Sequence, residues 1–206
     1  MAGRYLLTAA ALVLCPVAAW AQQPKAATYI TDEEVKTVAA VTGVDHTIRV
    51  VDIGTEHLAV GIIHRGPSGV PATTAGRGAA QPGQPCGEAV ANAGSDLASG
   101  ISHDSQTESY VIVSGGGTLV TGGRIVNGRK SAPDSDVTKV LNGPSCSGSI
   151  AGADVVRRQV KTGDIIIIPA GVPHGWTDIA DHVDYLSIRP SDHVLEAGYV
   201  HPAIRK

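Results

Sequence analysis

The chain has 206 residues, of which 43% are hydrophobic and 17% are charged, and its formal net charge is -3. These values describe one globular domain or two small ones, exclude an intrinsically disordered chain, and with a pI near 6.2 exclude a basic nucleic-acid-binding surface. Glycine (25) and proline (12) are abundant and phenylalanine is absent, so the core must consist of smaller aliphatic side chains. This composition favours many short strands joined by turns.

Residues 1–21 have the layout of a cleaved signal peptide. A basic start at Arg4 is followed by an apolar run over 5–19 and by a small-x-small ending at Ala21. The alternative is a membrane anchor, but a run of about 15 residues is short for a span, which needs about 20. A lipid anchor on Cys15 is disfavoured by the bulky residue before it. We therefore expect a secreted or periplasmic protein without membrane attachment after cleavage.

The mature chain divides into three parts. Residues 22–47 form a leader and a short helix, 48–190 form a β-barrel, and 191–206 form a C-terminal tail. The helix is predicted over about 32–41, because Thr31 and Glu34 make a capping box before apolar residues at helical spacing. Alternating β-branched residues and turns predict the strands that follow. These expected strands are 48–51, 58–63, 108–113, 117–121, 154–160, 164–168 and 183–188.

Two long connections interrupt these strands, at 66–100 and at about 127–152. Some eight to ten short strands in one domain indicate a sandwich or barrel, with the connections near its mouth. The glycines 115–117 are expected to form a tight turn between two strands. The run of four isoleucines over 165–168 is expected to be a strand buried on both faces.

Each long connection carries one of the two cysteines of the mature chain, Cys86 and Cys146. An oxidising compartment allows them to pair, and a disulfide would join two loops that are rich in glycine, serine and proline. Two free thiols are the alternative.

The most informative segment is GDIIIIPAGVPHGWTD, which begins at Gly163. Pro169 and Gly171 force a turn that presents His174 at the start of the next strand. The segment resembles the second motif of the cupin family, G-x5-P-x-G-x2-H-x3-N. Four positions match at the required spacing, and Asp178 stands where the family has asparagine.

An upstream segment resembles the later part of the first cupin motif, H-x-H-x4-E-x6-G. His103, Glu108 and Gly115 match it, whereas Ile101 occupies the position of the first histidine. The resemblance implies an all-β, single-domain jelly-roll barrel. Cupins usually hold a divalent metal with three histidines and one glutamate, so His103, Glu108 and His174 are the implied ligands. The ion could be iron, manganese, zinc, copper or nickel.

Two histidines and one carboxylate leave coordination positions open for substrate and oxygen. The resemblance therefore implies a metal-dependent oxidoreductase of the dioxygenase type that acts on a small molecule. A metal-dependent isomerase or lyase is an alternative, and so is a non-catalytic small-ligand-binding module, with or without metal. A homodimer is a further implication. Signatures of serine hydrolases, P-loop proteins, dinucleotide-binding proteins and zinc proteases are absent from the sequence.

Several further side chains are candidates for the barrel interior. Tyr110 shares a strand face with Glu108 and would contact substrate, support Glu108, or simply pack in the core. Candidate substrate contacts are Trp176, Tyr185 and Arg189. His64 could point inward in place of the missing ligand or lie at a strand end, and His182 could line the pocket. The histidines expected in solvent are His46, His57, His193 and His201.

Overall fold

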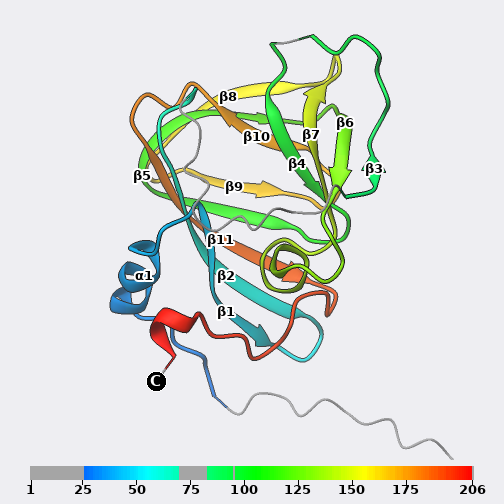
Figure 1. The fold of residues 1–206 in the computed structure, drawn as a ribbon. Coiled ribbons are helices and arrows are strands. Elements are labelled where there is room, and N and C mark those ends of the chain that lie inside the picture. Colours follow the sequence, from blue (N-terminus) through cyan, green and yellow to red (C-terminus); the bar gives the residue numbers. More distant parts are fainter. Residues whose placement is uncertain (1–25, 70–82, 95, 206) are drawn as a thin grey trace, which may run out of the picture.

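The computed structural model describes residues 26–69, 83–94 and 96–205 (Figure 1). The predicted signal peptide lies outside these residues, as does part of the first long connection. The helices are α1 (Asp32–Ala39), the π-helix η1 (Val137–Leu141) and the 3-10 helix η2 (Pro202–Ile204). The strands are β1 (Asp45–Asp52), β2 (His57–Arg65), β3 (Pro85–Cys86), β4 (Ser99–His103), β5 (Glu108–Thr121), β6 (Arg124–Lys130), β7 (Ser145–Ala151), β8 (Val156–Lys161), β9 (Ile165–Ile168), β10 (His174–Thr177) and β11 (Val183–Ser191).

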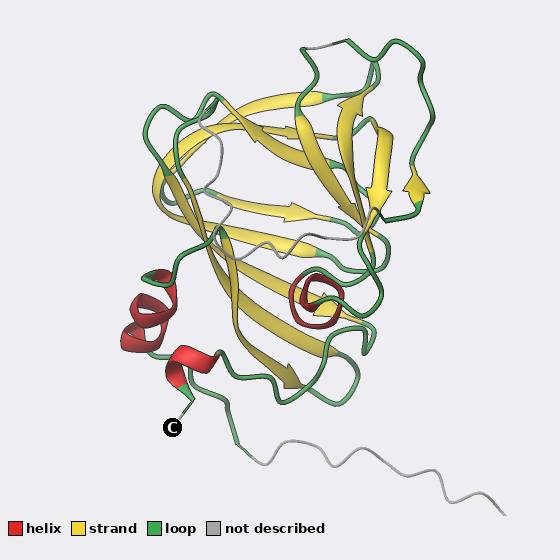
Figure 2. Cartoon of the chain, in the orientation of Figure 1, coloured by secondary structure: helices red, strands yellow, loops and turns green. Residues whose placement is uncertain are grey.

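The named strands pair antiparallel and curl into a barrel (Figure 2). One side of the barrel has the order β1-β2-β11-β5-β9, and the other continues from β5 through β10, β4, β7, β6 and β3, with β8 also paired to β5. Buried side chains of both sides meet in the interior, where the largest apolar cluster includes Ile63, Tyr110, Leu119 and Tyr185. The predicted all-β jelly-roll barrel is confirmed.

β5 belongs to both sides of the barrel because it bends at Gly115. It pairs with β11 up to this residue and with β8 from Gly116 onward. Gly115 has a φ of 67°, and an added Cβ would lie 2.0 Å from the carbonyl oxygen of His182, so no other residue fits without distortion. The prediction of two strands separated by a tight turn is wrong. The glycines bend one continuous strand instead of reversing it.

The segment 127–152 is more regular than predicted, since it contains the end of β6, η1 and β7. Its glycines permit close strand packing: a Cβ on Gly148 would lie 2.7 Å from the carbonyl oxygen of Val126. A composition typical of loops therefore serves here to bring β6 and β7 together.

The isoleucine strand β9 is buried on one face only. Ile165 and Ile167 are 69% and 70% exposed, whereas Ile168 is buried. β9 pairs only with β5, and its outer face has no cover in the described part of the chain. The prediction of a strand buried on both faces is wrong. The helix α1 covers the outer face of β1 and β2 and does not reach β9.

The predicted helix α1 is confirmed together with its capping box, although it ends two residues earlier than expected. Its Val38 is fully buried against Ile48 and Ile62 on β1 and β2. The C-terminal tail packs on the same sheet, where Leu195 is buried beside Val50. Both chain ends of the described fold thus stabilise one side of the barrel.

Cys86 and Cys146 form a disulfide, with a Cα–Cα distance of 6.0 Å. The predicted pairing is confirmed. It links β3 of the first connection to β7 of the second across 60 residues of sequence. Such a closed loop restricts the unfolded chain and thereby favours the folded state.

Candidate metal centre

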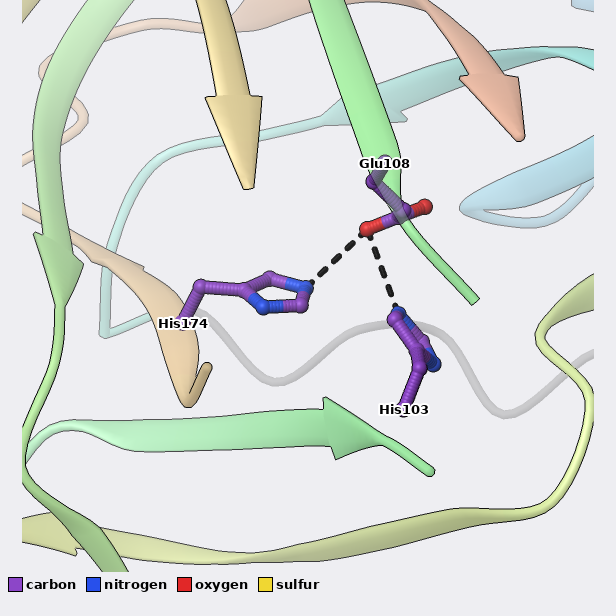
Figure 3. A group of neighbouring side chains, drawn as sticks. All are labelled: His103, Glu108 and His174. Atoms are coloured by element: carbon purple, nitrogen blue, oxygen red, sulfur yellow. Dashed lines mark ion pairs between the residues drawn. The ribbon is translucent and has the colours of Figure 1, made fainter. Parts of the chain in front are cut away.

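Three strand ends meet inside the barrel and bring His103, Glu108 and His174 together (Figure 3). His103 ends β4, Glu108 begins β5 and His174 begins β10. The turn before β10 is tied to β4, since the amide of Gly171 donates to the carbonyl of His103 at 2.7 Å. All three side chains are buried. The spacing of the motif residues therefore sets the positions of the turns, and these turns direct the three side chains to one point inside the barrel.

The three side chains converge through specific atoms. Oε2 of Glu108 lies 3.0 Å from Nε2 of His174 and 3.2 Å from Nε2 of His103 (Figure 3). The candidate ligand atoms all lie within 4.8 Å of one another. Ligands about 2.1 Å from a metal ion and about 90° apart would be separated by about 3.0 Å, so this spacing suits a first-row divalent ion.

Neighbouring acceptors determine which ring nitrogen of each histidine carries the proton. Nδ1 of His174 lies 3.0 Å from the carbonyl oxygen of Val172, which can only accept, so Nδ1 is the donor. Nδ1 of His103 lies 2.9 Å from the hydroxyl of Ser145. That hydroxyl can donate to the carbonyl of Gly143 at 2.9 Å, which leaves its oxygen able to accept from Nδ1 of His103. With the proton on Nδ1, each imidazole would turn a lone pair on Nε2 toward Glu108.

Two lone pairs thus face a carboxylate oxygen in a buried site. Neither Nε2 atom has a hydrogen-bond partner within acceptable geometry in the described part of the chain. Three electron-rich atoms at this spacing repel one another unless a cation, or an additional proton, lies between them. The donor set fits a divalent metal held by two imidazoles and one carboxylate.

Both carboxylate oxygens of Glu108 also accept hydrogen bonds from neighbouring side chains. Oε1 accepts from Nε of Arg189 at 2.7 Å and from the hydroxyl of Ser187 at 2.9 Å, and Oε2 accepts from the hydroxyl of Tyr110 at 2.7 Å. Burial alone would raise the pKa of Glu108, but the charge of the Arg189 guanidinium holds that pKa well below its usual value. Glu108 is therefore ionised and fixed in orientation.

Arg189 is completely buried and bridges two carboxylates. Its Nη2 makes two hydrogen bonds with Asp45, at 2.8 and 2.9 Å, while Nε contacts Glu108. Burial opposes the charged form, but Asp45 and Glu108 raise the pKa of Arg189 above its ordinary value. The guanidinium that was expected to contact substrate is instead committed to protein groups.

The three aromatic candidates line one region of the barrel interior. The ring centroids of Tyr110 and Tyr185 are 4.3 Å apart, and those of Trp176 and Tyr185 are 5.5 Å apart. Burial, and for Tyr110 the charge of Glu108, raises the pKa of both phenols. The hydroxyl of Tyr185 accepts from Nε of Arg65 at 2.9 Å. Nε1 of Trp176 is buried without a partner among the described residues.

Of the two alternatives for His64, the structure bears out the strand end: His64 is the second-last residue of β2 and does not point into the barrel. Its side chain is exposed and its Nδ1 lies 2.6 Å from Asp184. His182 interacts with Ser114 and Asp181, also away from the three converging residues. Ile101 pairs with His174 in the strand register, so the position of the first motif histidine adjoins the centre but offers no ligand atom.

Three of the four histidines expected in solvent are at least partly buried: His46 lies in β1, His57 lies in β2, and His201 in the tail is buried. His201 is only 9% exposed, and its Nδ1 accepts from the amide of Ala203 at the start of η2. Its ring lies edge-on to that of His46, with centroids 5.6 Å apart. The prediction failed because the tail that carries His201 packs onto the sheet.

Three supporting residues were not identified from the sequence. They are Asp45, Ser145 and Ser187. Ser187 lies between Tyr185 and Arg189 at strand spacing, so the period-two pattern could have revealed it. Asp45 and Ser145 carry no such signal, because each is brought to the site by a distant pairing.

Comparison with protein-family models finds no match, and comparison with curated proteins finds none either. Solved structures give distant likenesses. An uncharacterized Klebsiella pneumoniae protein with a double-stranded β-helix domain is 18% identical, with 82% of this chain and 94% of that chain covered and a TM-score of 0.38. A Bacteroides fragilis cupin protein is 14% identical, with coverages of 72% and 78% and a TM-score of 0.31. Oxalate oxidase in complex with the substrate analogue glycolate is 14% identical, with coverages of 75% and 55% and a TM-score of 0.34.

The fold and the motif residues together define the class of protein. An antiparallel jelly-roll barrel carries both motif segments, and their residues converge at one buried centre. The chain is an antiparallel jelly-roll barrel with a candidate metal site of two histidines and one glutamate. None of its helices, over the ranges described, has the length and hydrophobicity that a membrane-spanning segment needs.

Proposed function

We propose that the protein is a secreted metal-dependent oxidoreductase of the dioxygenase type, which acts on a small molecule. His103, Glu108 and His174 would hold one divalent ion. The observation that carries the proposal is the convergence of Nε2 of His103 and Nε2 of His174 on Oε2 of buried Glu108. A bound ion would supply Lewis-acid or redox chemistry and would leave positions for small ligands, since Ile101 offers none.

The surrounding residues would prepare this centre for metal. Arg189 and Ser187 hold one oxygen of Glu108, so the other oxygen faces the imidazoles. Val172 and Ser145 keep the two imidazoles in the tautomer that leaves Nε2 free. Such contacts commonly account for tenfold to hundredfold in metal affinity.

Other residues would receive the small molecule. The neutral Tyr110 hydroxyl lies next to the ligand oxygen, where it can donate a hydrogen bond to Glu108 or to a bound molecule. The unpartnered Nε1 of Trp176 is a free donor for an oxygen or nitrogen acceptor. Trp176 and Tyr185 supply apolar ring faces, which suit a ligand with both an apolar part and an acceptor.

A non-catalytic ligand-binding module is the second candidate. It is favoured by two observations: Ile101 replaces the usual first histidine, and Glu108 already has a buried counterion in Arg189. In that case the barrel would bind its ligand without turnover. A metal-dependent isomerase or lyase would use the same centre without consuming oxygen.

Reconstitution of the mature protein separately with iron, manganese, zinc, copper and nickel tests the proposal. We expect one ion per chain after gel filtration, and loss of that ion in His103→Ala, Glu108→Gln and His174→Ala. His64→Ala is the matched control, since His64 is exposed and lies outside the centre. No stoichiometric metal with any of the five ions would refute the proposal. Oxygen uptake with a panel of small organic molecules then separates an oxidoreductase from an isomerase, lyase or binder.

Export and dimerisation are also part of the proposal. The Cys86–Cys146 disulfide is consistent with an oxidising compartment, and mass spectrometry of the exported protein should find a mature chain that begins at residue 22. A homodimer would use the outer face of β9, where Ile165 and Ile167 are exposed. Ile167→Asp should then convert the dimer to a monomer in analytical ultracentrifugation, whereas a monomeric parent would exclude dimerisation.

A further inference from the structure

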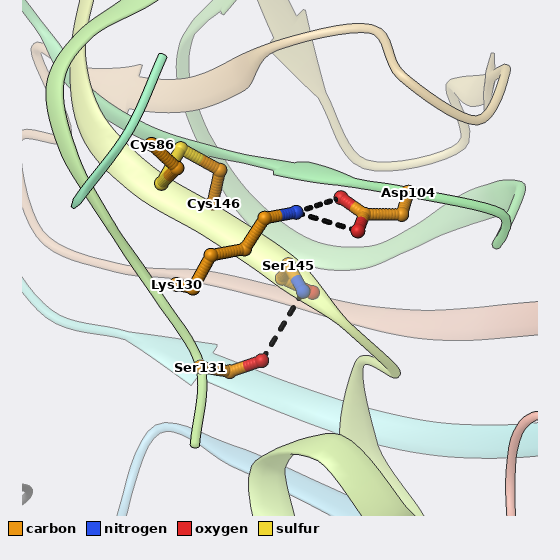
Figure 4. Close-up of a disulfide and its surroundings, with 6 residues drawn as sticks. All are labelled: Cys86, Asp104, Lys130, Ser131, Ser145 and Cys146. Atoms are coloured by element: carbon orange, nitrogen blue, oxygen red, sulfur yellow. Dashed lines mark hydrogen bonds and ion pairs between the residues drawn. A yellow bond between two sulfur atoms is a disulfide. The ribbon is translucent and has the colours of Figure 1, made fainter. Parts of the chain in front are cut away.

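A cavity of about 300 Å³ lies beside the disulfide, on the side of the β4–β7 strand pair away from the candidate metal centre. Both cysteines line it, together with Ser102, Lys130 and Gly171. Lys130 extends past Cys146 to the carboxylate of Asp104, and both of its Nζ–oxygen distances are 2.5 Å (Figure 4). Cys86 is only partly buried. The disulfide is therefore placed where a small solvent-borne thiol could reach it.

The same strand pair connects this cavity to the metal centre. Ser102 pairs with Cys146, and the next pair in the register is His103 with Ser145. Successive side chains on a strand point to opposite faces, so Cys146 lies on the cavity side while Ser145 lies on the side of the centre. Ser145 is the residue whose hydroxyl fixes the tautomer of His103. The disulfide cysteine Cys146 is thus the direct neighbour in sequence of Ser145, which contacts the candidate ligand His103.

The surroundings of Cys146 are tightly packed. An added Cβ on Gly128 would lie only 2.7 Å from the Cys146 sulfur, so that side has no free space. Reduction removes the covalent link, and two thiols must separate to van der Waals contact. β3 is anchored to β6 by backbone hydrogen bonds on both sides of Cys86, from Lys130 to Gln84 and from Glu88 to Ile125. We therefore expect Cys146 to take up part of the displacement and to pass it to its neighbour Ser145.

We propose that Cys86–Cys146 is a thiol–disulfide exchange site whose redox state sets the metal affinity of the centre. The inference rests on the proposed metal centre. The thiolate of a small thiol would attack one cysteine sulfur, form a mixed disulfide and release the other cysteine as a thiolate, which takes up a proton. A second thiol then displaces the first. Two electrons and two protons pass to the protein, and the two small thiols leave as their disulfide.

The test is a Co²⁺ titration of the full mature chain, followed by its visible absorption, in the oxidised state and after reduction and anaerobic removal of the reductant. We expect the oxidised protein to bind Co²⁺ on the order of tenfold more tightly, the low end of what a lost contact to a metal ligand costs. Glutathione should also reduce the disulfide in the folded protein without denaturant. Reduction that needs denaturant would overturn the exchange site.

Two serine variants locate the coupling. Ser145→Ala should bind Co²⁺ more weakly when oxidised and should show no further change on reduction. Ser147→Ala is the matched control, because Ser147 lies on the same strand and is exposed; it should respond to reduction like the parent.

Each contrary outcome has a separate meaning. Equal affinities in the two redox states, or a Ser145→Ala protein that still responds, would overturn the coupling while leaving the metal centre intact. Loss of the far-UV circular dichroism spectrum on reduction would also overturn it, because a switch needs a folded reduced state. Failure of the oxidised parent to bind Co²⁺ would instead refute the metal centre itself.

Discussion

Arg189→Met gives a severe test of how the centre is held together. Arg189 is 0% exposed, and methionine approximates the length of its aliphatic part without its charge. The variant leaves Glu108 buried with two hydrogen bonds, from Ser187 and Tyr110, but without a counterion. It also removes both hydrogen bonds to Asp45.

The expected loss follows from the burial of this pair. Removing one partner of a buried, hydrogen-bonded ion pair typically costs about 3–5 kcal/mol, because a charge remains without compensation. For a chain of this size, 1 kcal/mol lowers the melting temperature by about 2–4 °C, so a decrease of about 6–20 °C is expected. Urea denaturation with constant m-value would measure the free energy of unfolding directly.

A double-variant cycle tests the origin of the loss. Asp45→Asn removes the second carboxylate that Arg189 pairs with, so the combined variant should recover part of the loss, with a coupling of about 1–3 kcal/mol. Arg158→Met on the exposed surface of β8 is the control and should change stability by less than about 0.5 kcal/mol. If Arg189→Met costs less than about 1 kcal/mol, the buried ion pair does not hold Glu108 as described.

Three further predictions concern other parts of the fold. Replacing both Cys86 and Cys146 by serine should lower the free energy of unfolding by about 4 kcal/mol, as expected for a closed loop spanning 60 residues, in guanidinium titrations of oxidised protein. Gly115→Ala should cost at least about 2 kcal/mol in thermal melts, since its Cβ would overlap the carbonyl of His182 at 2.0 Å. His201 has a pKa below its ordinary 6.5, mainly through burial. The unfolded chain therefore binds its proton more readily, so stability should rise with pH through the interval between the lowered pKa and 6.5, and His201→Asn should flatten that rise in urea titrations.

Matched changes control these three experiments. Gly66→Ala should be nearly neutral, because an added Cβ there meets no atom within 4 Å, and an equal loss at Gly66 and Gly115 would contradict the bend in β5. The parent protein with its disulfide reduced should have the same free energy of unfolding as the double serine variant. His193→Asn changes an exposed histidine, so a flattening equal to that of His201→Asn would assign the pH dependence elsewhere.

The sequence was most informative where function depends on local spacing. Gly171 adopts a φ of 80° in the turn that precedes His174, a conformation that favours glycine. The motif therefore contains a residue needed for the backbone turn as well as a candidate ligand. The strand pattern also placed Glu108 and Tyr110 on one face, and their side chains are hydrogen-bonded. Such features depend on residues that are close in sequence, so they can be predicted from the sequence alone.

Features that depend on distant pairing were not readable. Asp45 contacts Arg189 across 144 positions, and nothing near Asp45 in the sequence marks it as part of the centre. Ser145 lies in a glycine- and serine-rich segment whose composition is typical of a loop, yet it forms part of β7 and holds His103. The isoleucines of β9 were predicted to be buried, but Ile165 and Ile167 are exposed. Hydrophobicity alone does not show which face of a sheet is covered by other elements.

The ligand set is the central claim, and X-ray absorption spectroscopy of the metal-reconstituted mature protein tests it most directly. We expect two imidazole ligands and at least one oxygen ligand per ion in the parent, and a single imidazole for any ion that stays bound to His174→Gln. Two imidazoles retained in His174→Gln, or no imidazole scattering in the parent, would contradict the assignment of His103, Glu108 and His174 as the metal centre.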